Sequence, residues 1–252
     1  MGRVALALRA QQESRRVGDE LQAAGVRALL LKGPDLQQRL YDTPSAYASA
    51  DVDILVRRER AKAARDHLER RGWTFAPENG VLWRASRAAS FDRDGFTVDL
   101  HWGLHAAHLP AWSLEPLNRR LWQGAREGSS GMLEPDPESL LVFLAVHAVG
   151  HGFERPEWTE NVRRAAALVT DWPEVWRIAY AARVTHAVKA ALAADGSPTS
   201  TAVLDGTWGR LVSGSTWLTR GHFVPASLRD RVRSAAALGR KGFDSFGRRR
   251  GR

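Results

Sequence analysis

The chain has 252 residues, of which 44% are hydrophobic and 26% charged, values that suit a soluble globular protein of one large domain or two moderate ones. It holds no cysteine, which excludes disulfides, cysteine zinc sites and thiol nucleophiles. The net charge of +9 suits a polyanionic partner such as a nucleotide or nucleic acid.

The first residues and the apolar runs of the chain lead to an expectation about its location, and the last residues lead to one about a basic arm. The first residues bring arginine and glutamine too early for a signal peptide, and no apolar run approaches the ~20 residues of a membrane span. We therefore expect a cytoplasmic protein that does not enter a membrane. Residues 240–252 carry five arginines and one lysine against Asp244 alone. They predict a disordered basic arm, which is either a solubilising end or a weak nucleic-acid contact.

The first elements alternate between helix and strand. Residues 4–24 place apolar side chains at roughly helical spacing, and residues 26–31 form a short apolar run that predicts a buried strand. Lys32-Gly33-Pro34 ends that strand, and we expect Asp35 to cap a helix that reaches Tyr41. A strand that leads through glycine into a helix can leave backbone N–H groups available to an anion.

The next strand, residues 51–56, carries two carboxylates. Asp51 and Asp53 are two positions apart, so they project from the same face, while Val52 and Ile54 anchor the strand on the other face. Carboxylates this close repel each other unless a cation lies nearby, and Mg²⁺ held by carboxylates and substrate phosphates is a common solution. Taken alone, the pair is more often an exposed acidic strand end without a ligand.

The remaining elements divide the chain into an α/β part and a helical part. A helix and several strands precede residue 105, a loop-rich stretch follows up to residue 134, and everything beyond it has helical patterns. The predicted strands span residues 73–76, 81–85, 89–92 and 96–102, and the last two are joined by a turn at Asp94-Gly95. The predicted helices span residues 58–71, 138–150, 158–169, 172–183, 184–194 and 228–238. A linker is predicted at residues 197–207.

This pattern predicts an α+β fold, with a mixed sheet and flanking helices followed by a C-terminal helical bundle. We expect a catalytic domain at 1–105, a loop-rich connector at 106–137, a helical domain at 138–239 and a basic tail at 240–252.

A third carboxylate comes from the strand at 96–102. Asp99 lies between Val98 and Leu100, which point the other way. The α/β part thus combines a strand–glycine–helix turn, the pair of aspartates and a lone aspartate on a later strand. Two metal ions bridged by three carboxylates can stabilise both the attacking and the leaving oxygen of an in-line phosphoryl displacement. The combination is far more specific than any of its parts.

Several motifs resemble those of the uncharacterised bacterial nucleotidyltransferases within the DNA polymerase β-like superfamily. The resemblance covers about residues 20–105 and extends more weakly into the helical part. The segments that carry it are Leu-Leu-Leu-Lys-Gly-Pro-Asp-Leu (29–36), Tyr41, Ala-Asp-Val-Asp-Ile-Leu-Val (50–56), Val-Asp-Leu-His-Trp (98–102) and His-Ala-Val-Gly-His (147–151).

The resemblance implies a minimal nucleotidyltransferase fold, Mg²⁺ or Mn²⁺ as cofactor, and an NTP as co-substrate. It implies that Asp51 and Asp53 bind both metals, and that Asp99 binds the catalytic metal and helps to activate the acceptor hydroxyl. Gly33 would lie under the triphosphate, with Lys32 close by. The chain departs from the superfamily at the phosphate turn, where Gly33-Pro34 replaces the usual Gly-Ser pair.

Three histidines are weaker candidates. His147 and His151 have i, i+4 spacing on one helix, which could serve zinc, but Ala148 stands where a metalloprotease motif needs glutamate. We favour a structural role for them or a role in lining the acceptor side. We place His101 on the opposite face of its strand from Asp99, where packing beside Trp102 is as plausible as orienting another group.

The leading hypothesis is a Mg²⁺-dependent nucleotidyltransferase that moves a nucleoside monophosphate from an NTP to an acceptor hydroxyl or similar group. We favour a small molecule, a natural-product peptide or a protein as acceptor over RNA. Two alternatives stay open: a catalytically idle nucleotide- or RNA-binding module that keeps the fold, and a toxin-type nucleotidyltransferase that acts on tRNA.

Overall fold

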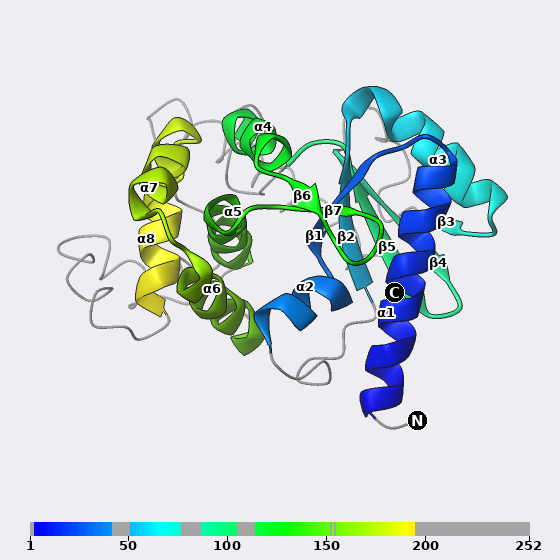
Figure 1. The fold of residues 1–252 in the computed structure, drawn as a ribbon, viewed down its shortest axis with the longest axis horizontal. Coiled ribbons are helices and arrows are strands. Elements are labelled where there is room, and N and C mark those ends of the chain that lie inside the picture. Colours follow the sequence, from blue (N-terminus) through cyan, green and yellow to red (C-terminus); the bar gives the residue numbers. More distant parts are fainter. Residues whose placement is uncertain are drawn as a thin grey trace, which may run out of the picture. The chain divides into compact units, whose positions relative to one another are not determined.

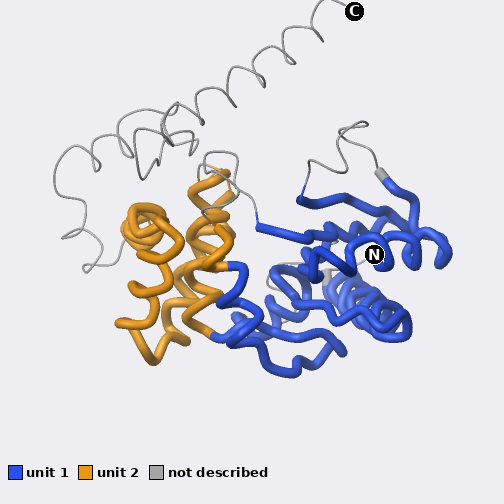
Figure 2. Tube along the Cα trace, turned by 90° about the horizontal axis from the view of Figure 1, so that it is seen from above, with its two compact units in different colours: residues 1–104, 118–136 blue, residues 105–117, 137–252 orange. Residues whose placement is uncertain are grey.

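The structure is a computed structural model that describes residues 3–41, 51–76, 87–104, 114–151, 153 and 155–194 (Figure 1). The chain forms two compact units, shown in blue and orange in Figure 2. The first unit comprises residues 1–104 and 118–136, and the second comprises residues 105–117 and 137–252.

In the part of the chain that the structure describes, the first unit is built on a mixed sheet of seven strands in the order β3-β4-β5-β2-β1-β7-β6. Its strands are β1 (Ala28–Lys32), β2 (Asp51–Val56), β3 (Thr74–Ala76), β4 (Ala88–Arg93), β5 (Phe96–His101), β6 (Arg126–Glu127) and β7 (Leu133–Glu134). Its helices are α1 (Arg3–Ala23), α2 (Pro34–Leu40), the short 3₁₀ helix η1 (Arg58–Arg60) and α3 (Ala61–Arg70), and α4 (Glu115–Gln123) runs from one unit into the other.

The centre of the sheet consists of β5, β2 and β1 (Figure 1). β2 pairs with β5 in parallel and with β1 antiparallel. Branched and long apolar residues suit this position because both faces of a central strand are covered. Accordingly, Leu29, Leu30 and Leu31 of β1 and Ile54 and Leu55 of β2 are all fully buried.

A β-bulge interrupts the ladder between β1 and β2. Leu30 lies opposite Ile54, and the next pair joins Lys32 to Asp53. An uninterrupted antiparallel register would place Leu31 opposite Asp53. The bulge inserts one residue into β1 and so brings a lysine to the aspartate.

A buried carboxylate connects α1 to the edge of the sheet. Glu20 on α1 is 5% exposed and accepts hydrogen bonds from the indole nitrogen of Trp73 at 3.0 Å and from Arg93 at 3.2 Å. Arg93 also lies over the Trp73 ring, 4.1 Å from its centroid. Burial raises the pKa of Glu20, but these hydrogen bonds and the charge of Arg93 outweigh it and hold the pKa below its usual range.

The second unit is helical over its described residues. Its helices are α5 (Pro137–Gly150), α6 (Pro156–Leu168), α7 (Trp172–Ala181) and α8 (Thr185–Ala194), and α5 packs against the other three. α5 is buried almost all round, as expected for the central helix of a bundle. The buried Glu138 in its first turn accepts hydrogen bonds from the backbone N–H groups of Thr170 and Asp171, both at 3.2 Å, at the start of α7.

The predicted α+β fold, a mixed sheet with flanking helices followed by a helical part, is confirmed. The largest difference lies in the stretch expected to be loop-rich, which contains α4 and the two-residue strands β6 and β7. The division into domains at residues 105, 137 and 239 stays a prediction. The predicted strand 81–85, linker 197–207, helix 228–238 and tail 240–252 lie outside the described residues.

The start of α2 differs from the expected cap. The helix begins at Pro34 with Gly33 as N-cap, so Asp35 is the second residue of the helix rather than its N-cap. Its side chain is buried and accepts a hydrogen bond from Ser14 of α1. None of the helices in the described ranges combines the length and the apolar character that crossing a membrane requires.

Candidate functional site

Two of the predicted carboxylates face each other across the parallel strands at the centre of the sheet. Asp53 on β2 and Asp99 on β5 are register partners, and Asp51 is paired in the same ladder with Thr97. Asp53 is 7% exposed, whereas Asp51 at the start of β2 is exposed. The sheet therefore brings together residues that are far apart in the sequence, on the face that the alternation of side chains predicts.

Each carboxylate oxygen of Asp53 contacts one neighbouring side chain. Its Oδ2 lies 3.0 Å from the Nζ of Lys32, and its Oδ1 lies 3.1 Å from the Nε2 of His101. Burial raises the pKa of Asp53, but the charge of Lys32 and the hydrogen bond to His101 outweigh it and hold the pKa well below its usual range. Asp53 is therefore ionised at neutral pH although it is buried.

The pKa of Asp99 is shifted in the opposite direction from that of Asp53. Burial raises its pKa, the hydrogen bond from Ser90 opposes that rise, and the carboxylates of Asp53 and Asp51 add to it. The three aspartates thus share one electrostatic environment in which ionised Asp53 resists the ionisation of Asp99. A cation placed among them would relieve this repulsion.

His101 corrects an expectation from the sequence. The sequence-based expectation is that His101 lies on the opposite face of β5 from Asp99, and it is wrong because residues two positions apart in a strand share a face. The structure accordingly directs His101 toward Asp53 on the neighbouring strand. Sequence reasoning also missed Ser90, the register partner of Asp99 on β4, because nothing in the local pattern shows which residue a strand will face.

Gly33 has a structural reason to be glycine. Its φ of 138° is a conformation that L-residues with a side chain rarely adopt, and a Cβ built there would lie 2.8 Å from Cγ2 of Val52. The turn after β1 therefore packs directly against the strand that carries Asp53. Whether the triphosphate lies over this turn stays a prediction.

The donor set suits a hard divalent cation. Carboxylate oxygens are the ligands that Mg²⁺ and Mn²⁺ prefer, and the mutual repulsion of the three aspartates favours a cation among them. Within the ranges that the structure describes, no three histidine, aspartate or glutamate side chains are arranged to hold a metal ion as they stand. Both oxygens of Asp53 are instead directed at Lys32 and His101.

The histidine pair of the second unit packs against a tryptophan. The ring of His147 lies 4.5 Å from that of His151 and 5.3 Å from that of Trp158, between centroids, and Trp158 is 4.8 Å from His151. The guanidinium of Arg155 lies 5.6 Å from the Trp158 ring. These contacts are compatible with a structural role for the two histidines, and a role in lining the acceptor side stays a prediction.

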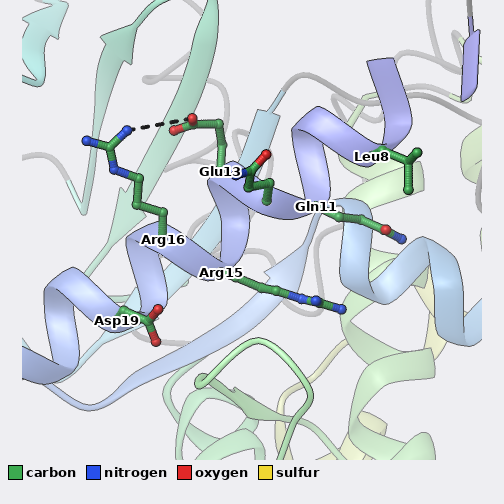
Figure 3. Close-up of a pocket in the computed structure, with 7 residues that line it drawn as sticks. Leu8, Gln11, Glu13, Arg15, Arg16 and Asp19 are labelled. Carbon is green, nitrogen blue, oxygen red and sulfur yellow. Dashed lines mark ion pairs between the residues drawn. The ribbon is translucent and has the colours of Figure 1, made fainter. Parts of the chain in front are cut away.

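A pocket of about 420 Å³ lies along α1 (Figure 3). Its lining side chains all belong to this helix, and the ion pair between Arg16 and Glu13 lies among them. The lining includes none of the five predicted site residues, namely Lys32, Gly33, Asp51, Asp53 and Asp99. The sheet face, rather than this pocket, therefore carries the candidate chemistry.

The comparison with protein families agrees with the motifs. Residues 4–194 match the model of a family described as uncharacterised nucleotidyltransferase. Among solved structures, the chain is similar to the antibiotic-resistance factor ANT(2'')-Ia, with 14% identity and a TM-score of 0.47 over 70% of this chain and 95% of the other. No curated protein matches the chain.

Proposed function

The chain belongs to the uncharacterised nucleotidyltransferase family, and we propose that it transfers a nucleoside monophosphate from an NTP to an acceptor hydroxyl or similar group in a Mg²⁺-dependent reaction. The observation that carries the proposal is the register pairing of Asp53 with Asp99, with Asp51 in the same ladder. A purely structural sheet gains little from placing a half-buried carboxylate, Asp99, beside a buried one, Asp53, since removing charge from water costs free energy.

Asp51, Asp53 and Asp99 are the residues that would hold the metal. When bound, Mg²⁺ or Mn²⁺ would neutralise phosphate charge and polarise the phosphoryl group. Asp53 supplies a carboxylate that Lys32 and His101 keep ionised. Ser90 orients the carboxylate of Asp99, whose raised pKa suits it to accept a proton from an acceptor hydroxyl.

Lys32 is the proposed contact of the triphosphate. Its ammonium is a compact charge on a flexible stem, a common partner of phosphate oxygens. Gly33 supports it by letting the chain turn closely past Val52. The acceptor is proposed to be a small molecule, a peptide or a protein rather than RNA.

The direct test is incubation of the full chain with each of the four α-labelled NTPs, Mg²⁺ and a panel of acceptors, followed by detection of label transfer. Asp53→Asn and Asp99→Asn keep side-chain size and are expected to reduce transfer by about a hundredfold to a thousandfold, as the loss of one charge-stabilising group commonly does. Asp92→Asn, on the exposed part of β4, is the matched control and should leave transfer intact. Transfer that survives Asp53→Asn would exclude the assignment.

One observation favours a second candidate, a nucleotide-binding module without catalysis. Lys32 and His101 already satisfy both oxygens of Asp53, so the carboxylate is stable without a metal. Calorimetry with ATP separates the two functions. Tight binding that does not need Mg²⁺, together with no label transfer, would favour the binding module.

The tRNA-directed alternative differs from the leading proposal only in its acceptor. Deletion of residues 240–252, which carry a strong positive charge, tests it. An RNA acceptor should bind the shortened chain less well and with a shallower salt dependence, because fewer counterions are released. A small-molecule acceptor should be unaffected.

A further inference from the structure

We propose that Lys32 is an internal counter-ion that takes the place of the metal at Asp53 and moves to the phosphates when metal and nucleotide bind. The inference rests on the proposed function, because it requires Asp53 to be a metal ligand. It assigns to Lys32 a resting role in addition to the phosphate contact.

The first observation that supports the proposal is that both carboxylate oxygens of Asp53 already contact neighbouring side chains. One carboxylate oxygen lies 3.0 Å from the ammonium of Lys32 and the other 3.1 Å from the ring of His101. A divalent cation at the same carboxylate would be pressed against the ammonium, and two like charges at contact distance repel strongly. One of the two neighbours therefore has to leave when metal binds.

Lys32 is the neighbour that can leave. Its charge sits at the end of a flexible four-carbon stem, whereas the imidazole of His101 is held on a short stem within β5. Lys32 is also the last residue of β1, where the chain turns out of the sheet at Gly33. The contact of His101 can persist, because carboxylates that bind metals are commonly hydrogen-bonded by neighbouring groups.

The second support is the bulge in β1. Without it, the register would place Leu31 opposite Asp53, and the pairing of Lys32 with Asp53 exists only because one residue is inserted. Bulges interrupt a ladder and commonly re-aim a side chain next to an active site. The lysine is thus brought to the carboxylate by the backbone itself.

The arrangement also fits the charge of the site. A carboxylate that is 7% exposed needs an opposite charge beside it, and the ammonium of Lys32 at 3.0 Å supplies one. The incoming metal then replaces one cation with another. The ammonium so released is available to the negatively charged phosphates that arrive with the metal.

The first experiment measures the accessibility of the Lys32 amine in the unmodified full chain. A limiting amount of an amine-acetylating reagent is applied with no ligand, with Mn²⁺, and with Mn²⁺ plus a non-hydrolysable ATP analogue, and acetylation is quantified by peptide mass spectrometry. We expect Mn²⁺ to raise the acetylation rate of Lys32 several-fold and the analogue to lower it again. Lys62, which pairs with Asp66 on the surface of α3, is the internal control and should not change.

The second experiment measures Mn²⁺ affinity by electron paramagnetic resonance, without nucleotide. Lys32→Met removes the charge but keeps the length of the stem. We expect it to bind Mn²⁺ about tenfold more tightly than the native chain, since a neighbouring charge shifts such equilibria by about one to three powers of ten. Lys62→Met is the matched control and should bind like the native chain.

The outcomes separate this inference from the proposed function. If Mn²⁺ binds the native chain but leaves the acetylation of Lys32 unchanged, Lys32 does not move and the inference is wrong, while the proposed function stands. An unchanged Mn²⁺ affinity in a folded Lys32→Met chain overturns the inference in the same way. If Mn²⁺ binds neither chain, the metal-dependent function fails and the inference fails with it.

Discussion

Ser90 and Asp99 lie opposite each other in the β4–β5 ladder. The hydroxyl of Ser90 also donates a hydrogen bond to the carboxylate of Asp99 at 2.5 Å. This hydrogen bond favours the ionised carboxylate and opposes the rise in pKa that burial causes. Ser90 thus helps to keep Asp99 in the form that could accept a proton.

Ser90→Ala is expected to move the acid limb of the pH–activity profile to higher pH. Removing the donor raises the pKa of Asp99 further, so a smaller fraction is ionised at a given pH. We expect activity on that limb to fall about tenfold, because a hydrogen bond to a charged group contributes about 1.5–3 kcal/mol. Ser90→Thr keeps the hydroxyl and should retain the native profile.

The matched control is Thr97→Val on the same pair of strands. The Thr97 hydroxyl bonds the exposed Asp92 rather than Asp99, so the acid limb should not move. An unshifted profile in a folded Ser90→Ala chain would show that Ser90 does not set the ionisation of Asp99.

Gly33→Ala is expected to destabilise the chain and to disturb the site. The new methyl group would meet Val52 at 2.8 Å and force an unfavourable backbone conformation. Gly25→Ala is the control: its φ is 69°, but no atom lies within 4 Å of the added Cβ. Gly25→Ala should cost about 1–2 kcal/mol of unfolding free energy from the backbone alone. Gly33→Ala should cost more in urea denaturation, and equal costs would argue against close packing on Val52.

The sequence predicted the carboxylates and their strands because local patterns carry that information. Alternation within residues 51–56 and 96–102 puts the aspartates on one face of each strand, and motif resemblance connects the two. Nothing local says that Asp53 lies beside Asp99 rather than one position away. Register depends on long-range pairing, and only the assembled sheet sets it.

The features that the sequence could not predict also depend on pairing between strands, or on elements too short to show a pattern. The bulge that brings Lys32 to Asp53 is a property of two strands, not of one. Strands β6 and β7 have two residues each, too short for an alternating pattern to be visible, and α4 lies among glycines and prolines that suggest loops. The error on His101 was one of geometry, since residues 99 and 101 share a face.

Glu20→Gln is expected to lower the unfolding free energy by about 2 kcal/mol at neutral pH, since hydrogen bonds to charged groups contribute about 1.5–3 kcal/mol. The pKa of Glu20 is lowered in the fold, so its stabilisation is present above the ordinary glutamate pKa and is lost as pH falls through the folded pKa. The difference between variant and native chain should therefore shrink in acid. Chemical denaturation at several pH values measures it.

The control for Glu20 is Glu160→Gln on α6. Glu160 pairs with Arg163 and Arg164 on the surface, and exposed pairs of this kind contribute about 0.2–1 kcal/mol. An effect of Glu160→Gln as large as that of Glu20→Gln would contradict the idea that burial makes the Glu20 cluster important.

Glu138→Leu is expected to destabilise the helical unit. Glu138 satisfies the backbone N–H groups of Thr170 and Asp171, and leucine would leave both without an acceptor. The loss should be about 1–3 kcal/mol, the cost of unsatisfied buried donors. Glu138→Gln keeps one acceptor oxygen and should lose less. Thermal denaturation compares the two, and equal stability of Glu138→Leu and the native chain would contradict the interpretation.

The parallel pairing of β2 with β5 also has a consequence for folding. Parallel neighbours cannot be joined by a tight turn. In this chain the connection between β2 and β5 consists of residues 57–95, which include α3, β3 and β4. Closing such a loop is slow compared with forming a hairpin. We therefore expect Asp53 and Asp99 to meet late in folding, when the middle of the sheet is complete. A partly folded chain has no paired carboxylates, so a substitution that weakens the sheet should reduce the number of competent molecules rather than the turnover of each one.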